Sequence, residues 1–206
     1  MNRPAQRKRE RYHHGELRAA LIDTAVELVA ERGVRNFSLA EASRRLGVAV
    51  SAPYAHFSDR DELLAAVAVH AYERFHAQLA AEIGRVEEPT ERVAAVARAY
   101  VRFAGTQRAL FEVLVEAGLD KDRHPEIEAA EKPVDDMFLD CVHALGDTDE
   151  AKDRELAIAV EAAAHGYATF LLDGDFGEGH EAVELAAERA ARTTRALVEG
   201  RHLLGA

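Results

Sequence analysis

Apolar residues recur along this chain at intervals of three and four positions, which is the spacing that one face of an α-helix requires. Turns rich in glycine, proline and aspartate separate the apolar stretches, and no strand-like alternation of apolar and polar residues lies between them. The sequence therefore predicts an all-α fold. The expected helices cover residues 17–32, 38–46, 58–83, 93–103, 109–117, 125–145, 151–172 and 180–203.

Residues 38–57, SLAEASRRLGVAVSAPYAHF, predict two short helices joined by a tight turn. Ser38 and Glu41 form a capping box, in which the serine hydroxyl accepts from the backbone N–H of Glu41 and the carboxylate reaches back to the N–H of Ser38. Gly47 gives the backbone the freedom to end the first helix. A second helix is expected over residues 50–57, with its proline tolerated in the first turn. This is helix-turn-helix geometry, in which the second helix lies in the DNA major groove.

The run GVAVSAPYAHFSDRDELL resembles the DNA-binding signature of TetR-family transcriptional regulators. The residues that carry the resemblance are Gly47, Val48, Ala49, Tyr54, His56, Phe57, Arg60, Leu63 and Leu64. Ala49 stands where the family usually has a capping serine or threonine, and Ala55 stands where a larger residue is common. Because a missing cap costs about 1 kcal/mol of local stability, we expect the second helix to be fully ordered only on DNA. Residues 162–176 resemble, more weakly, a TetR subgroup marked by Trp-His-Gly, with Ala164 in place of the tryptophan.

Charge divides the chain near residue 60. Residues 1–60 hold 11 Lys+Arg against 7 Asp+Glu, a balance of +4, and the remainder holds 15 against 30, a balance of −15; together these give the net charge of −11. We expect a flexible basic arm over residues 1–14, a helix-turn-helix DNA-binding domain over 15–60, and a helical regulatory and dimerisation domain over 61–206. The arm is either a solvated tail or a segment that reaches phosphates or an adjacent minor groove.

The resemblance implies a surface that contacts double-stranded DNA. Side chains that offer donors to phosphates are Arg11, Ser38, Tyr54, His56 and Arg60. Base edges would be read by Val50, Ser51, Ala52 and Ala55. Because these four side chains are small, DNA shape should carry more of the specificity than it does for a helix rich in arginine or asparagine.

A ligand site is expected between the helices of the second domain, because helical bundles place pockets there. The candidates to line it are Tyr72, Phe75, Tyr100, Phe103, Phe111, Phe138 and Phe170, with His143 as a polar group. His70 and His165 are the alternatives for that polar group. Aromatic residues at helical spacing are more often plain core, so core packing stays the alternative for each of them.

The last two expected helices, 151–172 and 180–203, are rich in alanine and can therefore approach other helices closely. Their faces can pack within the chain or against a second copy. The resemblance implies a homodimer formed through these two helices, and a palindromic operator requires such a two-fold assembly.

Several kinds of chemistry find no support in the sequence. Cys141 is the one cysteine, which excludes an intramolecular disulfide and suits a reducing compartment. No apolar run approaches the roughly 20 residues of a membrane span, and no signal-peptide core follows the basic N-terminus, so we expect a cytoplasmic protein. No metal-ligand spacing or phosphate loop occurs, so we expect neither a cofactor nor an enzyme.

The sequence thus predicts a ligand-responsive transcriptional regulator. The leading interpretation is a homodimeric repressor that a small-molecule effector of unknown identity releases from a palindromic operator. An activator of the same build would have the same residues. A helical enzyme or small-molecule-binding protein without DNA function is the poorer alternative.

Overall fold

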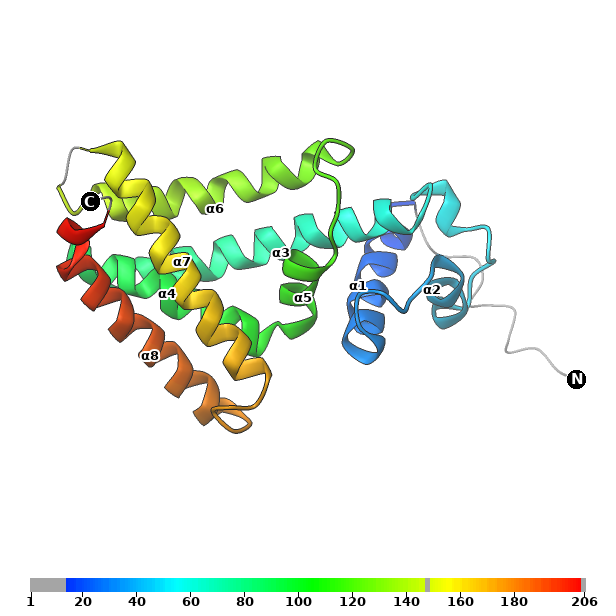
Figure 1. Ribbon diagram of the computed structural model, residues 1–206. Coiled ribbons are helices and arrows are strands. Elements are labelled where there is room, and N and C mark those ends of the chain that lie inside the picture. Colours follow the sequence, from blue (N-terminus) through cyan, green and yellow to red (C-terminus); the bar gives the residue numbers. More distant parts are fainter. Residues whose placement is uncertain (1–13, 147–148, 205–206) are drawn as a thin grey trace, which may run out of the picture. The chain divides into compact units, whose positions relative to one another are not determined.

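The computed structural model describes residues 14–146 and 149–204, and within these ranges it contains helices and turns but no strand (Figure 1). The prediction of an all-α fold is confirmed. The helices are α1 (His14–Arg32), α2 (Leu39–Leu46), α3 (Arg60–Ile83), α4 (Pro89–Thr106), α5 (Arg108–Glu116), α6 (Pro125–His143), α7 (Glu150–Leu172) and α8 (His180–Glu199), with single 3₁₀ turns η1 (Pro53–Ala55) and η2 (Arg201–Leu203).

Packing divides the chain into two units. One unit ends at Ala71 and also takes in Ala109–Ile127, and the other comprises Tyr72–Arg108 and the chain from Glu128 onward. The packing boundary therefore lies inside α3, whereas the domain boundary predicted from charge, at residue 60, falls where that helix begins.

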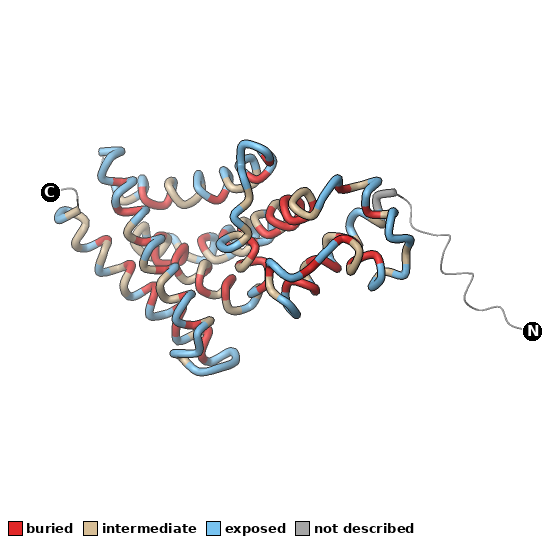
Figure 2. The backbone as a smooth tube through the Cα atoms, turned by 45° about the vertical axis from the view of Figure 1, so that its right-hand side comes forward, coloured by how far each residue is buried: buried red, intermediate tan, exposed pale blue. Residues whose placement is uncertain are grey.

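The first unit is built on leucine and phenylalanine side chains that the amphipathic helices turn inward. Leu21 and Leu28 of α1, and Leu63 and Leu64 of α3, are 0 % exposed, and Phe57 just before α3 is 1 % exposed. Burial of such a side chain contributes roughly 1.5–3 kcal/mol. Figure 2 shows buried and exposed positions alternating along the helices, as the helical spacing of apolar residues requires.

Helix α4 packs against both α7 and α8, which also pack against each other. The alanine-rich face of α8 makes this close packing achievable, since Ala186 and Ala190 are fully buried. That face is therefore used within the chain. Helix α8 ends at Glu199, before the expected residue 203, because Gly200 follows it and a single 3₁₀ turn replaces the last helical turn.

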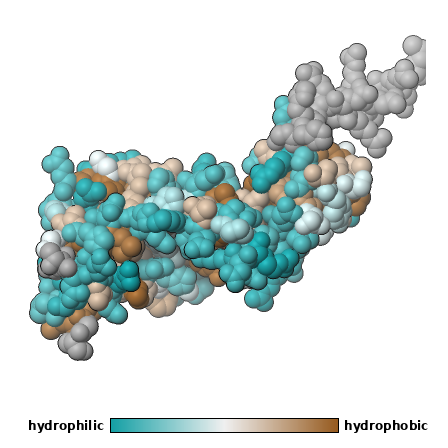
Figure 3. Space-filling model, turned by 90° about the horizontal axis from the view of Figure 1, so that it is seen from above, coloured by the Kyte–Doolittle hydropathy of each residue, from teal (hydrophilic) through white to brown (hydrophobic). Residues whose placement is uncertain are grey.

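None of the described helices is long and apolar enough to cross a membrane. On the face drawn in Figure 3 the surface is mainly hydrophilic, and hydrophobic residues form separate patches on it. The largest exposed apolar side chains on the last two helices are Ile158 and Phe170 of α7 and Leu185 of α8.

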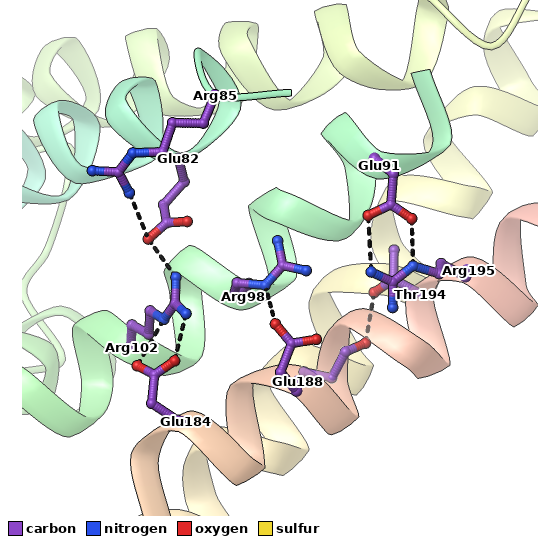
Figure 4. A network of polar contacts seen from close by, with 10 residues as sticks. Glu82, Arg85, Glu91, Arg98, Arg102, Glu184, Glu188, Thr194 and Arg195 are labelled. Carbon is purple, nitrogen blue, oxygen red and sulfur yellow. Dashed lines mark hydrogen bonds and ion pairs between the residues drawn. The ribbon is translucent and has the colours of Figure 1, made fainter. Parts of the chain in front are cut away.

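Arginine and glutamate side chains fasten α4 to its neighbours along one edge (Figure 4). Arg102 lies 2.5 Å from Glu184 of α8 and 2.7 Å from Glu82 of α3. Further along the same helices Arg98 lies 2.6 Å from Glu188, and Glu91 of α4 pairs at 2.5 Å with Arg195 of α8. These side chains are partly exposed, so each pair contributes about 1 kcal/mol or less, but together they fix the register of α4 against α8.

Candidate nucleic-acid interface and ligand pocket

Helix α2 begins at a serine cap, as the sequence predicts. The backbone N–H of Glu41 donates to Ser38 Oγ at 3.2 Å. The second half of the predicted capping box is wrong, because the Glu41 carboxylate lies 3.2 Å from Arg32 and 2.5 Å from Arg44. Two guanidinium groups attract the carboxylate more strongly than one uncharged backbone N–H does. Hydrogen bonding to Arg44 accordingly holds the pKa of Glu41 below its usual value.

Gly47 ends α2 in the left-handed region, with φ of 69°. Its backbone N–H donates to the carbonyl of Arg44 at 3.2 Å, and the N–H of Val48 donates to the carbonyl of Ser43 at 3.1 Å. Only glycine adopts this φ at little cost. The turn of the predicted helix-turn-helix is therefore present.

The α-helix predicted over residues 50–57 is wrong for this structure, which has turns around the single 3₁₀ turn η1 (Pro53–Ala55). The physical reason lies in two residues. Pro53 has no N–H to donate to the carbonyl of Ala49, so that the N–H of Ala52 bonds there instead, at 2.9 Å. No side chain caps the start of η1, so the first backbone N–H groups of the segment gain no side-chain acceptor there.

This segment, residues 50–56, nevertheless exposes three of its four predicted base-reading residues and also Tyr54, the predicted phosphate contact. Val50 is 53 % exposed and Tyr54 is 57 % exposed, and Ser51 and Ala55 are exposed beside them. Ala52 and His56 are half-buried, and Ser38 is exposed at the start of α2. Arg11 lies outside the described residues.

Arg60 is directed toward the interior of the first unit. Its Nη2 donates to the backbone carbonyl of Val34, and its guanidinium carbon lies 5.1 Å from the centroid of the Phe37 ring. The Arg60 Nη1 lies 3.4 Å from Asp61. The structure does not bring Arg60 together with Tyr54, so a contact of Arg60 with phosphate stays a prediction that requires the guanidinium to leave these partners.

Two further arginines belong to this surface and were missed from the sequence. Arg18 of α1 lies with its guanidinium carbon 5.3 Å from the centroid of the Phe57 ring, beside the end of the 50–56 segment. Arg35 is exposed and forms no ion pair within the described part of the chain. A signal for Arg35 was present, because it is the only basic residue between the end of α1 and the capping serine. Arg45, by contrast, forms an ion pair with Glu31, with 2.6 Å between Arg45 Nη2 and Glu31 Oε2.

The second unit contains a pocket with about 430 Å³ of empty space, part of it open to solvent. Four helices line it: α3 with Phe75 and Leu79, α4 with Val96, Ala97 and Tyr100, α6 with Val134, Asp135 and Phe138, and α7 with Val160, Glu161 and Ala164. Phe75, Tyr100 and Phe138 are thus brought together as expected for a ligand site. Burial raises the pKa of the Tyr100 hydroxyl, and the charge of Glu161 raises it further, so this phenol stays protonated.

The other five candidate ligand residues do not line this pocket. Phe103 is buried with its ring centroid 5.1 Å from that of Phe75, and Phe111 is buried in the first unit. Phe170 is 54 % exposed. Tyr72 donates a hydrogen bond of 2.8 Å to Glu131, and His143 Nε2 lies 3.4 Å from Asp153. A role of these five in ligand binding stays a prediction that this pocket does not support.

The pocket also contains two carboxylates, Asp135 and Glu161, that were not predicted from the sequence. Asp135 lies one helical turn before Phe138, so their i, i+3 spacing could have placed both on one face. Glu161 lies between the pocket residues Val160 and Ala164. No group of three or more histidine, cysteine, aspartate or glutamate side chains able to hold a metal ion occurs among the residues that the structure describes.

Two family models match the chain. Residues 21–67 match the model described as "Bacterial regulatory proteins, tetR family", which covers α1, α2 and the start of α3. Residues 93–197 match the model described as "Tetracyclin repressor-like, C-terminal domain", which covers α4 into α8.

Curated relatives match over part of the chain. The HTH-type transcriptional regulator BetI of Brucella anthropi is 33 % identical over 92 residues, which is 45 % of this chain and 46 % of the relative. BetI of Brucella melitensis is 30 % identical over the same length. The match thus spans about half the length of these relatives.

Solved structures match over nearly the whole chain. A protein of unknown function from Rhodococcus sp. RHA1 is 28 % identical with a TM-score of 0.73, covering 91 % of this chain and 97 % of that one. A tetR-family bacterial regulatory protein from Rhodococcus RHA1 has a TM-score of 0.68 at 17 % identity, covering 88 % and 96 % of the two chains. At that identity the second likeness shows the fold alone.

Proposed function

The chain belongs to the TetR family of bacterial regulatory proteins, and from this premise we propose that it is a homodimeric repressor released from a palindromic operator by a small-molecule effector. That it is a transcriptional regulator with a DNA-binding domain, and not an enzyme, follows from the family. The observation that carries the proposal is the combination, in one chain, of an exposed 50–56 segment after a capped helix and a pocket lined by four helices.

We propose that the 50–56 segment enters the major groove. Val50, Ser51 and Ala55 are exposed and offer methyl groups and one hydroxyl to base edges, and the exposed Tyr54 offers its hydroxyl to a phosphate. The uncapped 3₁₀ turn then completes a helical turn on DNA, where phosphates and bases provide the partners that the free chain lacks. Arg35 adds an uncommitted positive charge at the edge of the same unit.

We propose that the dimer forms through the exposed faces of α7 and α8. Ile158, Ala162, Gly166 and Phe170 recur every four residues on α7, and the two large members are 61 % and 54 % exposed. A side chain added at Gly166 would meet nothing within 4 Å in the single chain. Leu185 of α8 is 45 % exposed. Large apolar residues with small ones between them suit a two-fold helix-to-helix contact.

The effector is proposed to act through the pocket. Phe75 and Leu79 of α3 form part of its wall, and α3 begins at Arg60, soon after the 50–56 segment. A ligand that binds one arrangement of α3 more tightly shifts the protein toward that arrangement. In a DNA-bound dimer the two recognition segments must lie about 34–36 Å apart to reach successive major grooves. A regulator of this kind acts where its DNA is, so we expect it in the cytoplasm.

The test is binding of the purified protein to DNA from its own upstream region, titrated with salt and with random competitor. We expect a discrete complex that survives competitor, protects a palindrome, and has the mass of a dimer on DNA in sedimentation. Small molecules are then screened for release of that complex, with a reporter gene to give the sign of regulation. Operator affinity that responds to no small molecule would remove the ligand-responsive part of the proposal. A monomeric complex would remove the dimer, and a reporter that falls silent without the protein would make it an activator.

A further inference from the structure

We propose that the effector is an apolar cation, held in the pocket of the second unit by aromatic rings and by the carboxylates of Asp135 and Glu161. This inference rests on the proposed ligand-responsive function and names the class of molecule that the pocket selects. Its basis is the combination of an apolar cavity with two acidic side chains on two of its walls.

The walls of the pocket favour an apolar ligand body. Aliphatic side chains from α3, α4, α6 and α7 make up most of the lining, namely Leu79, Val96, Ala97, Val134, Val160 and Ala164. Aromatic rings come from three different helices, with Phe75, Tyr100 and Phe138. The ring centroids of Phe75 and Tyr100 lie 5.8 Å apart with an interplanar angle of 81°. The face of an aromatic ring carries partial negative charge, so rings around a cavity attract a cation that has lost its water.

The formal charge of the lining is negative. Asp135 on α6 and Glu161 on α7 are its charged residues, and no lysine, arginine or histidine lines the pocket in the described part of the chain. Glu161 forms no ion pair with any residue that the structure describes. Its charge acts inside the pocket, because it raises the pKa of the Tyr100 hydroxyl beyond the effect of burial alone.

The nearby basic side chain on α6 is already committed. Lys132 lies 2.7 Å from Asp136, and the charges of Asp136 and, more weakly, Asp135 raise the pKa of its ammonium group. Glu131, one turn before Asp135, accepts a hydrogen bond of 2.8 Å from Tyr72. No lysine or arginine is among the residues that α6 contributes to the pocket lining.

These features rank three classes of ligand. An anion would bring its charge against two carboxylates in a partly desolvated space, where like charges repel. A neutral apolar molecule would gain the contact with the walls but nothing from the charges. A cation with an apolar body gains both, and each exposed carboxylate or ring contributes a factor of roughly three to ten in affinity.

A matched set of probes tests this ranking on the full-length protein. The cation is (1-naphthylmethyl)trimethylammonium, its neutral isostere is 1-neopentylnaphthalene, and the anion is 1-naphthylacetate. Binding is measured by equilibrium dialysis with absorbance of the naphthalene ring in the protein-free chamber, where the five tyrosines of the chain do not interfere. We expect the cation to bind at least about tenfold more tightly than the neutral isostere, and the anion to bind weakest.

Charge-removing variants locate the effect. Glu161→Gln and Asp135→Asn should each weaken cation binding by roughly three- to tenfold and leave the neutral isostere unchanged. Glu155→Gln removes the same charge from an exposed position on α7 outside the pocket, and it should leave all three probes unchanged. Helicity and melting of every variant are checked by circular dichroism, and since all three positions are exposed, folding should persist.

Cation affinity equal to or below that of the neutral isostere, or equal losses in Glu155→Gln and Glu161→Gln, overturns the inference. Absence of any cation binding overturns it as well. The regulatory proposal is judged separately, by adding the probe to the operator complex. Charge-selective binding without any effect on DNA release supports the ligand class and argues against the proposed regulation.

Discussion

Gly105 of α4 lies where α4 approaches α7 and α8 closely, and replacing it by alanine tests how tightly these three helices are packed. A Cβ atom at Gly105 would lie 2.7 Å from Val183 Cγ2 of α8 and 3.0 Å from Leu171 Cδ2 of α7. Val183 is 8 % exposed, and because a β-branched side chain on a helix has essentially one χ1 rotamer, it cannot swing away. The added methyl group must therefore push α4 and α8 apart.

Two opposing effects set the magnitude. Overpacking of a well-filled core costs about 1–3 kcal/mol, whereas replacing glycine by alanine in a helix gains about 0.5–1 kcal/mol. For Gly105→Ala we expect a net loss of about 1–2 kcal/mol in the free energy of unfolding. In a chain of this length that corresponds to a fall in melting temperature of roughly 2–8 °C.

The assay is denaturant unfolding followed by circular dichroism, with all variants at one protein concentration because dimer stability depends on concentration. The matched variant is Val183→Ala, which removes both close Val183 methyl groups, leaves only the movable end of the Leu171 side chain near the new Cβ, and costs about 2 kcal/mol by itself. In that background Gly105→Ala should be neutral or stabilising, giving a coupling energy of about 2 kcal/mol. If Gly105→Ala stabilises the unaltered protein, Val183 yields without cost and the reasoning from close approach is refuted.

Three further outcomes follow from the contacts described above. Gly47→Ala forces a Cβ into a backbone with φ of 69° and should destabilise the first unit by about 1 kcal/mol in thermal unfolding, with a parallel loss of DNA affinity. Glu184→Gln removes a partner of Arg102, whose hydrogen bond lowers the pKa of Glu184 in the folded protein. The unaltered protein should therefore be more stable than the variant by about 0.5–1 kcal/mol above the pKa that Glu184 has in the unfolded chain, and should lose this advantage as pH falls through the pKa of Glu184 in the folded protein. A stability difference that is the same at all pH values would contradict this. Tyr54→Phe should weaken DNA binding by a similar factor for operator and random sequences in competition assays, and a loss confined to the operator would assign Tyr54 to base reading.

Most of the fold could be predicted because the helices are amphipathic and clearly punctuated. The apolar spacing of α1 and α3 and the turn at Gly47 depend on residues near one another in sequence. Helix ends were predicted less well, as at Gly200, because competition between a helical and a 3₁₀ turn involves energies of a few tenths of a kcal/mol. The close packing at Gly105 could not be predicted, because it depends on residues far along the chain.

The same holds for the functional surfaces: features that depend on neighbouring residues could be predicted, and features that depend on residues far apart in the sequence could not. Helix 50–57 was predicted from the pattern of residues 38–57, yet Pro53 and the uncapped Ala49 leave only a 3₁₀ turn in the free chain. The inward direction of Arg60 depends on Phe37 and Val34, which periodicity alone does not bring near it. For the pocket, helical spacing puts aromatic rings on interior faces but does not say which ones leave space between them.

Helix α3 connects the two proposed activities along one continuous piece of backbone. Its start is fastened to the first unit, because the N–H of Ser58 donates to the Glu62 carboxylate at 2.5 Å and Arg60 donates to the carbonyl of Val34. Its later turns put Phe75 and Leu79 in the wall of the pocket. A joint that bends freely at residues 58–60 would absorb any shift of the helix, but these contacts stiffen that joint. We therefore expect a ligand that displaces the later turns of α3 to act on the 50–56 segment through the helix itself.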